Sequence, residues 1–257
     1  MKPHLLLELC FLLMEDIQQS SQRVRSNAMK RYIDLSGKLE IGLWSYQVLP
    51  GLENIITPVS IETIATVKKD DFFASRLSLT TISGTYVEAG SHILEDGKLL
   101  EDYTVEDFIK PAFIVKLPPQ EPKSRIDGKL LEKYIPGDIS LKGHALIIQT
   151  DWGKKWNKKG YVLECPNYTK DAIELVISME ISIFGVDVPC IEGAWSGEVV
   201  EEKGGLLGML FKRDILLVAP LVNLDKVKGN RGTLYALPLH LAGTSGAPAR
   251  VVFEEEI

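Results

Sequence analysis

Two residues with the chemistry of metal ligands, Glu88 and His92, lie four positions apart in the stretch TISGTYVEAGSH (81–92). Carboxylate and imidazole groups bind divalent metals, and an imidazole can also act as a general base near neutral pH. A catalytic zinc ion usually needs three protein ligands and one open position for water. The stretch therefore resembles a metal-binding loop from which ligands are missing, and any surviving chemistry depends on Glu88 and His92.

Other residues with reactive side chains are few and scattered. His4, His144 and His240 are distant from the 81–92 stretch in the sequence, and Cys165 and Cys190 have no histidine beside them. Isolated cysteines of this kind are usually buried structural thiols. The sequence has no glycine-rich phosphate loop and no His-Glu-x-x-His motif. The 81–92 stretch is therefore the main candidate site.

The composition argues against some classes of binding partner. The chain has 257 residues, 45% of them hydrophobic, and a formal net charge of -6, which is atypical of a general nucleic-acid or anionic-membrane binder. The lysine-rich run KKWNKK (154–159) is more typical of a solvated face than of a phosphate-binding groove. The three cysteines are too few and too widely spaced for a disulfide framework, so we expect a cytoplasmic protein.

The first 28 residues differ from the rest of the chain. The apolar run 5–14 is too short to span a bilayer, which needs roughly 20 residues, and its spacing predicts a short amphipathic helix. The triplet Ser26-Asn27-Ala28 before Met29 is typical of a remnant of cloning. We therefore expect residues 1–28 to be an N-terminal extension or a cloning-derived segment, and residues 29–257 to form one domain.

Hydrophobic periodicity predicts a mixture of strands and helices from residue 30 onward. Short apolar runs bounded by turn residues predict strands at 31–37, 112–118, 144–150, 183–189, 215–223, 234–243 and 249–255, with strand, turn and strand over 78–90. Helical spacing and threonine caps predict helices at 169–182, at 206–214 and at 104–110, the last with Glu106 in a capping box and Pro111 as its end. The proline-rich segment 118–129 predicts a surface loop. This order of elements indicates one α/β domain with a mixed sheet.

Several stretches resemble, in the same order, the cyclase and kynurenine-formamidase family of metal-dependent hydrolases. The stretch 82–92 aligns through Gly84-Thr85 with the family signature His-x-Gly-Thr-His-x-Asp-x-Pro-x-His. Four further stretches are similar to family motifs: YIDLSG (32–37), GVDVPC (185–190), ILLVAPLVNL (215–224) and LPLHLAGTSGAPARVV (237–252). The resemblance covers about residues 30–253.

The resemblance implies a swivelling β/β/α fold that usually assembles as a homo-oligomer, such as a dimer or tetramer. It also implies one or two divalent metal ions, commonly zinc or manganese, and hydrolysis of an amide or cyclic amide bond, as in N-formylkynurenine or isatin. Trp44 and Tyr46 stand where the family often places pocket aromatics, although both can equally be core residues. Tyr86 and Cys190 fall at positions that would also line the pocket.

Most metal ligands that the resemblance implies are replaced in this sequence. The six family positions fall on or near Ile82, Tyr86, Glu88, His92, Gly208 and Ala219. Aliphatic side chains, glycine and alanine offer no lone pair, and a phenol with a pKa of about 10 is a poor ligand at neutral pH. Only Glu88, in place of an aspartate, and His92 keep a side chain that can bind a metal.

Two functions of different class follow from these losses. In the first, the protein is non-catalytic, needs no cofactor, and binds a small molecule in the ancestral pocket or a partner. In the second, it is a divergent metal-dependent amidohydrolase: Glu88 and His92 hold zinc or manganese with help from Asp187, Glu192 or Glu198, and His92 is the catalytic base. A subunit that assembles with an active relative is a third option. No nucleic-acid or membrane partner is expected.

Overall fold

The computed structural model describes residues 29–193, 195 and 201–256. The helix predicted within residues 1–28 and the candidate ligand Glu198 lie outside these ranges. Within them, no helix has the length and apolar character needed to pass through a bilayer.

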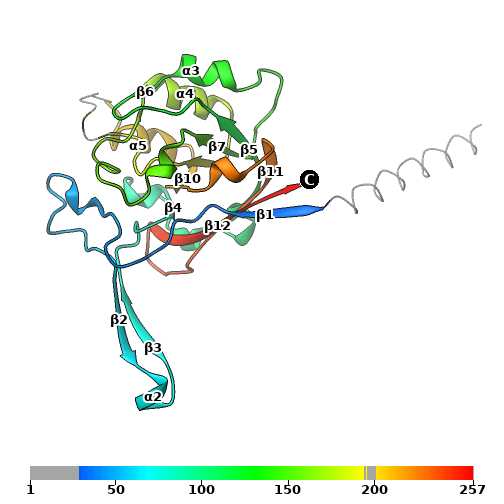
Figure 1. The fold of residues 1–257 in the computed structure, drawn as a ribbon. Coiled ribbons are helices and arrows are strands. Elements are labelled where there is room, and N and C mark those ends of the chain that lie inside the picture. The colour runs from blue at the N-terminus through cyan, green and yellow to red at the C-terminus, as the bar shows by residue number, and fades with distance from the viewer. Residues whose placement is uncertain (1–28, 194, 196–200, 257) are drawn as a thin grey trace, which may run out of the picture.

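An eight-stranded mixed sheet forms the centre of the molecule (Figure 1). Its strands follow the order β1-β12-β11-β5-β7-β9-β10-β4. The last strand in this order, β4, also pairs with the second strand, β12. The central strands β5, β7, β9 and β10 are parallel, whereas β1, β4, β11 and β12 pair antiparallel. The bounds are β1 (Lys30–Asp34), β4 (Tyr86–Glu88), β5 (Ile109–Lys116), β7 (Ala145–Gln149), β9 (Ile183–Val186), β10 (Leu216–Ala219), β11 (Arg231–Pro238) and β12 (Gly246–Glu256). The mixed sheet predicted from the sequence is confirmed.

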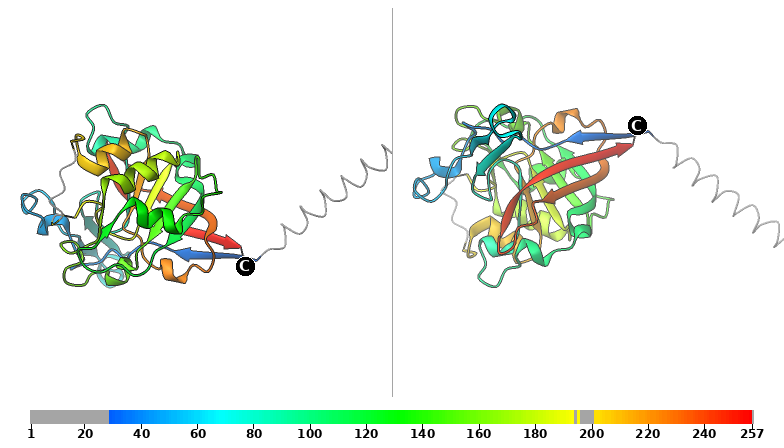
Figure 2. Two further views of the ribbon diagram at one scale, coloured as in Figure 1. Left: turned by 90° about the horizontal axis from the view of Figure 1, so that it is seen from above. Right: turned by 90° about the horizontal axis from the view of Figure 1, so that it is seen from below.

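The central strands are buried on both faces. On β7, Ala145 and Ile147 enter one hydrophobic core, whereas Leu146 and Ile148 enter the other. Parallel strands covered on both sides are expected to be apolar throughout, which explains the continuous apolar run of β7. One face is covered by three helices, α3 (Gly128–Tyr134), α4 (Lys170–Ser178) and α5 (Gly205–Phe211), of which α4 contacts the other two (Figures 1 and 2).

Short elements connect the sheet and the helices. The single-turn 3-10 helices are η1 (Tyr46–Val48), η2 (Gly90–His92), η3 (Leu100–Asp102), η4 (Val105–Phe108), η5 (Trp152–Lys155) and η6 (Leu224–Lys226). Strands β6 (Arg125–Ile126) and β8 (Asn167–Tyr168) form a separate parallel pair. The segment predicted as a loop at 118–129 therefore ends in a two-residue strand and the start of α3.

The helix predicted at 104–110 is wrong beyond its first turn. Only η4 forms there, and Asp107, not Glu106, closes the capping box by accepting the backbone N–H of Thr104 at 3.0 Å. Pro111 does not end a helix but lies within β5. The proline is tolerated because β5 pairs with β7 only from Ala112 onward, so the missing N–H interrupts no bond on that side.

The sequence interpretation missed a hairpin that projects from the body of the molecule (Figure 1). Strands β2 (Ser60–Ala65) and β3 (Ala74–Ser78) pair only with each other, and the one-turn helix α2 (Val67–Asp70) closes their tip. The sequence predicted a strand that begins at residue 78, whereas β3 ends at Ser78 and the next strand, β4, begins only at Tyr86. We call residues Ser60–Ser78 the arm.

Candidate functional site

Strand β4 and the turn before it position the stretch singled out in the sequence. Gly84 adopts a φ of 68°, a left-handed conformation that favours glycine. The Thr85 hydroxyl donates to the Pro220 carbonyl at 2.6 Å and accepts the Gly37 N–H at 2.9 Å. These bonds fix the turn, so that Tyr86 lies opposite Ala219 of β10 in register.

Glu88 and His92 contact each other at the end of β4. The His92 Nδ1 lies 3.2 Å from the Glu88 Oε1, and the Glu88 side chain is almost fully buried. Burial raises the pKa of Glu88 to about 8 and lowers the pKa of His92. Each shift favours the uncharged form, so burial weakens the ionic character of this contact at neutral pH.

Two tyrosines occupy the space beside Glu88. The Tyr46 hydroxyl donates to the Pro189 carbonyl and lies 2.9 Å from the Tyr86 hydroxyl. Both rings are buried, and burial raises both phenol pKa values well above their usual range. Tyr46 and Tyr86 therefore stay protonated and cannot serve as anionic ligands at neutral pH.

Cys190 lies in the same region but is not set up as a nucleophile. Its thiol lies 2.9 Å from the Glu192 carbonyl, and burial raises its pKa to about 12. A thiol with this pKa carries almost no thiolate at neutral pH, and the thiolate is the reactive form.

An aromatic cluster extends outward from Tyr46. The Trp44 ring lies 5.2 Å from Tyr46, 5.4 Å from Trp156 and 5.2 Å from Tyr161, measured between ring centroids. Three buried donors in this cluster have no hydrogen-bond partner among the described residues: the Trp44 Nε1, the Trp156 Nε1 and the Tyr161 hydroxyl. Buried polar groups in native proteins usually have partners, so these donors favour a site that receives acceptor atoms.

The donor set does not fit a catalytic metal ion. Ile82 and Ala219 lack lone pairs, Tyr86 is a protonated phenol, and Glu88 and His92 already bind each other. In the described part of the chain, no group of three or more His, Cys, Asp or Glu side chains is placed to hold a metal ion. No reaction step through a metal follows from this arrangement, because a catalytic zinc site needs about three protein ligands.

The carboxylates proposed as substitute ligands are engaged elsewhere. Both Asp187 oxygens accept the Thr150 N–H at 3.0 Å, and the Thr150 hydroxyl adds a bond of 2.5 Å. Glu192 accepts the Leu206 N–H at 2.9 Å. The pKa of Asp187 is raised to about 6, chiefly by burial, and its bonds fix the turn after β7 to the turn after β9. Asp187 therefore has a structural role here.

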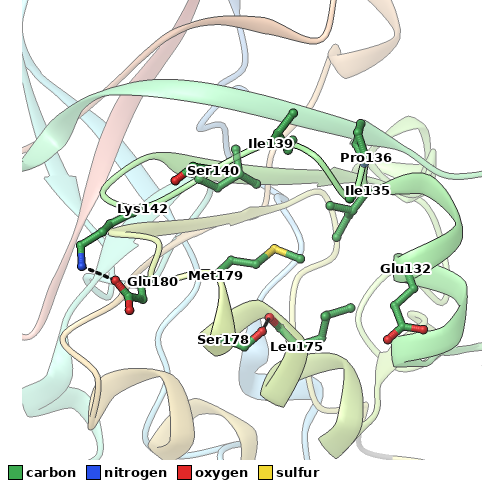
Figure 3. Close-up of a pocket in the computed structure, with 12 residues that line it drawn as sticks. Glu132, Ile135, Pro136, Ile139, Ser140, Lys142, Leu175, Ser178, Met179 and Glu180 are labelled. Atoms are coloured by element: carbon green, nitrogen blue, oxygen red, sulfur yellow. Dashed lines mark hydrogen bonds and ion pairs between the residues drawn. The ribbon is translucent and has the colours of Figure 1, made fainter.

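One hollow of the described surface lies apart from Glu88, His92 and the aromatic cluster. It has a volume of about 570 Å³ and lies between α3, α4 and the loop after α3, where Ile135, Leu175 and Met179 form its apolar floor and Lys142 pairs with Glu180 at its rim (Figure 3). It holds no cluster of reactive side chains. This hollow therefore offers no alternative catalytic site.

The structure brings most of the predicted site residues together. Tyr46, Tyr86 and Cys190 surround Glu88, and Trp44 packs on the outer side of Tyr46. Sequence reasoning missed Trp156 and Tyr161, which complete the aromatic cluster. The only signal for Trp156 was an aromatic residue inside a lysine-rich run, because a solvated lysine face does not by itself require a tryptophan.

Comparisons with known proteins identify the family and the fold of this chain. The Cyclase family model, described as "Putative cyclase", matches residues 33–193. Kynurenine formamidase from Bacillus anthracis is 27% identical over 226 residues, which cover 86% of this chain and 96% of that protein. Kynurenine formamidase from Bacillus thuringiensis (strain Al Hakam) is 29% identical over 178 residues, covering 69% of this chain and 78% of that protein.

Solved structures share the fold. An isatin hydrolase bound to the product analogue thioisatinate matches with a TM-score of 0.79 and 21% identity, over 95% of this chain and 99% of that chain. Isatin hydrolase A from Labrenzia aggregata matches with a TM-score of 0.79 and 20% identity, over 94% of this chain and all of that chain (100%). Since the family model spans well over half of the sequence, this chain belongs to the Cyclase family.

Proposed function

We propose that this protein is a non-catalytic member of the Cyclase family that acts by binding a small molecule. The observation that carries the proposal is the pairing of Glu88 with His92 beside the buried phenols Tyr46 and Tyr86. Burial favours the uncharged form of all four groups, and together they offer no set of three ligands for an ion that would activate water. The site therefore binds a ligand and catalyses no reaction.

The aromatic cluster supports a planar ligand that carries acceptor oxygens. The rings of Trp44 and Trp156 offer faces for stacking, and their Nε1 atoms are donors without a described partner. Buried indole N–H groups usually find an acceptor, and aromatic faces favour flat rings. Thioisatinate, the product analogue bound to the solved isatin hydrolase, and N-formylkynurenine, a substrate that the family resemblance implies, combine both features and are suitable probes.

Isothermal titration calorimetry with metal removed tests this proposal. We expect saturable binding of thioisatinate in EDTA, with a Kd on the order of 10–100 µM, and no conversion of N-formylkynurenine. Trp156→Phe should weaken binding about tenfold because one N–H donor is lost. Tyr235→Phe on β11, which lies outside the site, is the matched control. Absence of binding for both probes would refute the proposal.

A divergent amidohydrolase is the second candidate, and the contact between Glu88 and His92 favours it. An ionised Glu88 that accepts the Nδ1–H of His92 across their 3.2 Å contact would leave Nε2 free as a general base, so this activity requires a pH near or above the raised pKa of Glu88, about 8. On this view, N-formylkynurenine is hydrolysed and His92→Ala abolishes the turnover. Turnover by wild type that persists in His92→Ala would exclude this role for His92.

The proposed cytoplasmic location rests on the cysteines. Cys165 and Cys190 are free thiols in the described structure, as is usual in a reducing compartment. Mass spectrometry of protein purified without reductant should find both thiols unmodified. A disulfide in protein from its natural source would contradict the location.

A further inference from the structure

A second hollow of the described surface lies where β5 and β11 begin. It has a volume of about 350 Å³ and is lined by residues of both strands and of the loop that joins α3 to β7. Arg231, the first residue of β11, lies opposite Phe113 of β5, and its guanidinium carbon lies 5.9 Å from the centroid of the Phe113 ring. Among the described residues, neither the 81–92 stretch nor the aromatic cluster contributes to its lining. This hollow is therefore separate from the candidate site.

Two side chains of opposite charge line this hollow without pairing with each other. Arg231 and Asp138 are both solvent-exposed, and neither forms an ion pair within the described part of the chain. Arg250 on the neighbouring strand β12, by contrast, pairs with Asp34 at 2.8 Å. The hollow thus presents a positive and a negative group that are both available to a ligand.

The remaining side chains of the hollow offer both polar and apolar contacts. Ile139 and Leu141 contribute apolar surface, and Ser140 contributes a hydroxyl group. The His144 Nδ1 lies 3.0 Å from the Lys142 carbonyl, which can only accept, so the Nδ1–H donates to it and this bond holds the ring in place. Small-molecule sites usually combine an apolar lining with a few placed polar groups, in volumes from about 300 Å³ upward. The hollow therefore has the size and the lining of a site for a small molecule with charged and apolar parts.

We propose that this hollow binds an α-amino acid with an aliphatic side chain. Arg231 donates to the carboxylate of the ligand, Asp138 accepts from its ammonium group, and Ile139 and Leu141 contact its side chain. A ligand with only a carboxylate is repelled by Asp138, and a ligand with only an ammonium group is repelled by Arg231. The two charges therefore select a zwitterion over either singly charged molecule. This site is independent of the proposed function, because the two sites share no residue.

Isothermal titration calorimetry with L-leucine tests the proposal. We expect a Kd on the order of 1 mM, because both charged side chains are exposed and water weakens their pairing with a ligand. Two analogues of L-leucine separate the contributions of its charges: 4-methylpentanoate lacks the ammonium group, and 3-methylbutylamine lacks the carboxylate. Each analogue should bind wild type about tenfold more weakly than L-leucine does.

Variants of the two charged residues test the role of each. Arg231→Gln and Asp138→Asn should each weaken the binding of L-leucine about tenfold. In contrast, 4-methylpentanoate should bind Asp138→Asn more tightly than wild type, because a repulsive charge is removed. Arg76→Gln, which removes an exposed arginine on the arm, is the matched control and should bind L-leucine like wild type. Circular dichroism checks that all three variants fold.

Three results would overturn the proposal. They are the absence of L-leucine binding by wild type, equal affinity of wild type for L-leucine and 4-methylpentanoate, and L-leucine binding that Arg231→Gln leaves unchanged. The second of these results would assign the hollow to simple anions instead of amino acids.

Discussion

Replacing Glu88 by Gln is expected to remove the loss of stability that wild type shows as the pH rises above about 7. The pKa of Glu88 is raised from 4.5 in the unfolded chain to about 8 in the fold, because its carboxyl is buried. Between these values the folded protein keeps a proton that the unfolded chain has lost. The stability from Glu88 is thus fully present below pH 4.5 and is lost as the pH rises through about 8.

Two other buried groups limit the pH range in which the effect of Glu88 on stability can be measured alone. The pKa of Asp187 is raised to about 6, so its contribution is lost by about pH 7. The pKa of His92 is lowered, so its contribution rises with pH and is complete above the unfolded value of 6.5. From about pH 7 to about pH 8, the remaining dependence belongs to Glu88, because Asp187 and His92 then keep their charge and the buried thiols of Cys165 and Cys190, whose pKa values are also raised, contribute only at higher pH.

Thermal denaturation across this range measures the effect. Wild type should lose about 1 kcal/mol from about pH 7 to about pH 8, which lowers its Tm by roughly 2–4 °C for a chain of this size. Glu88→Gln keeps a neutral group in place and should show little change. Glu62→Gln on the exposed arm should fall in parallel with wild type. A Glu88→Gln curve parallel to wild type would show that Glu88 is ionised in the fold.

Restoring the missing ligands is expected to create a zinc site. The triple variant Ile82→His/Tyr86→His/Ala219→Glu adds three donors to Glu88 and His92. Residues 86 and 219 lie opposite each other in the ladder between β4 and β10, where Cβ atoms are about 5 Å apart. Replacing the tyrosine ring by an imidazole also makes room for the glutamate. Since a catalytic zinc ion needs about three ligands, we expect about one zinc per chain.

Metal analysis after gel filtration measures this gain. Ala219→Glu alone is the matched control and should stay near zero, because it adds a carboxylate without a nitrogen ligand. The double variant Tyr86→His/Ala219→Glu should bind zinc more weakly than the triple variant and provides a second test of the geometry. If the triple and double variants are folded but both lack zinc, the backbone at this site does not place the added side chains around a metal ion.

The central strands of the sheet were predictable because they are apolar on both faces. The run at 144–150 reads as a buried strand, and β7 at Ala145–Gln149 forms there with alternate residues in two cores. The helices at 169–182 and 206–214 were also predicted, although α4 and α5 are shorter. Local periodicity decides such elements, because burial selects for it.

The arm and the contacts within the site were not predictable in the same way. The arm has apolar residues but no core of its own, so its pattern does not distinguish it from a loop. The helix at 104–110 failed because pairing of β5 with β11 outweighs a helical pattern. The meeting of Tyr46 with Tyr86 and of Trp44 with Trp156 depends on chain segments far apart in sequence, which no local pattern encodes.

Metal content of the wild-type protein, measured together with turnover, tests the central claim most directly. The protein is purified without a histidine tag, supplied with zinc and manganese, separated from free metal and assayed with N-formylkynurenine and isatin. Because Glu88 and His92 satisfy each other, we predict well below about 0.1 metal ion per chain and no turnover. About one ion per chain that is lost in Glu88→Ala or His92→Ala, together with hydrolysis of either substrate, would contradict the claim.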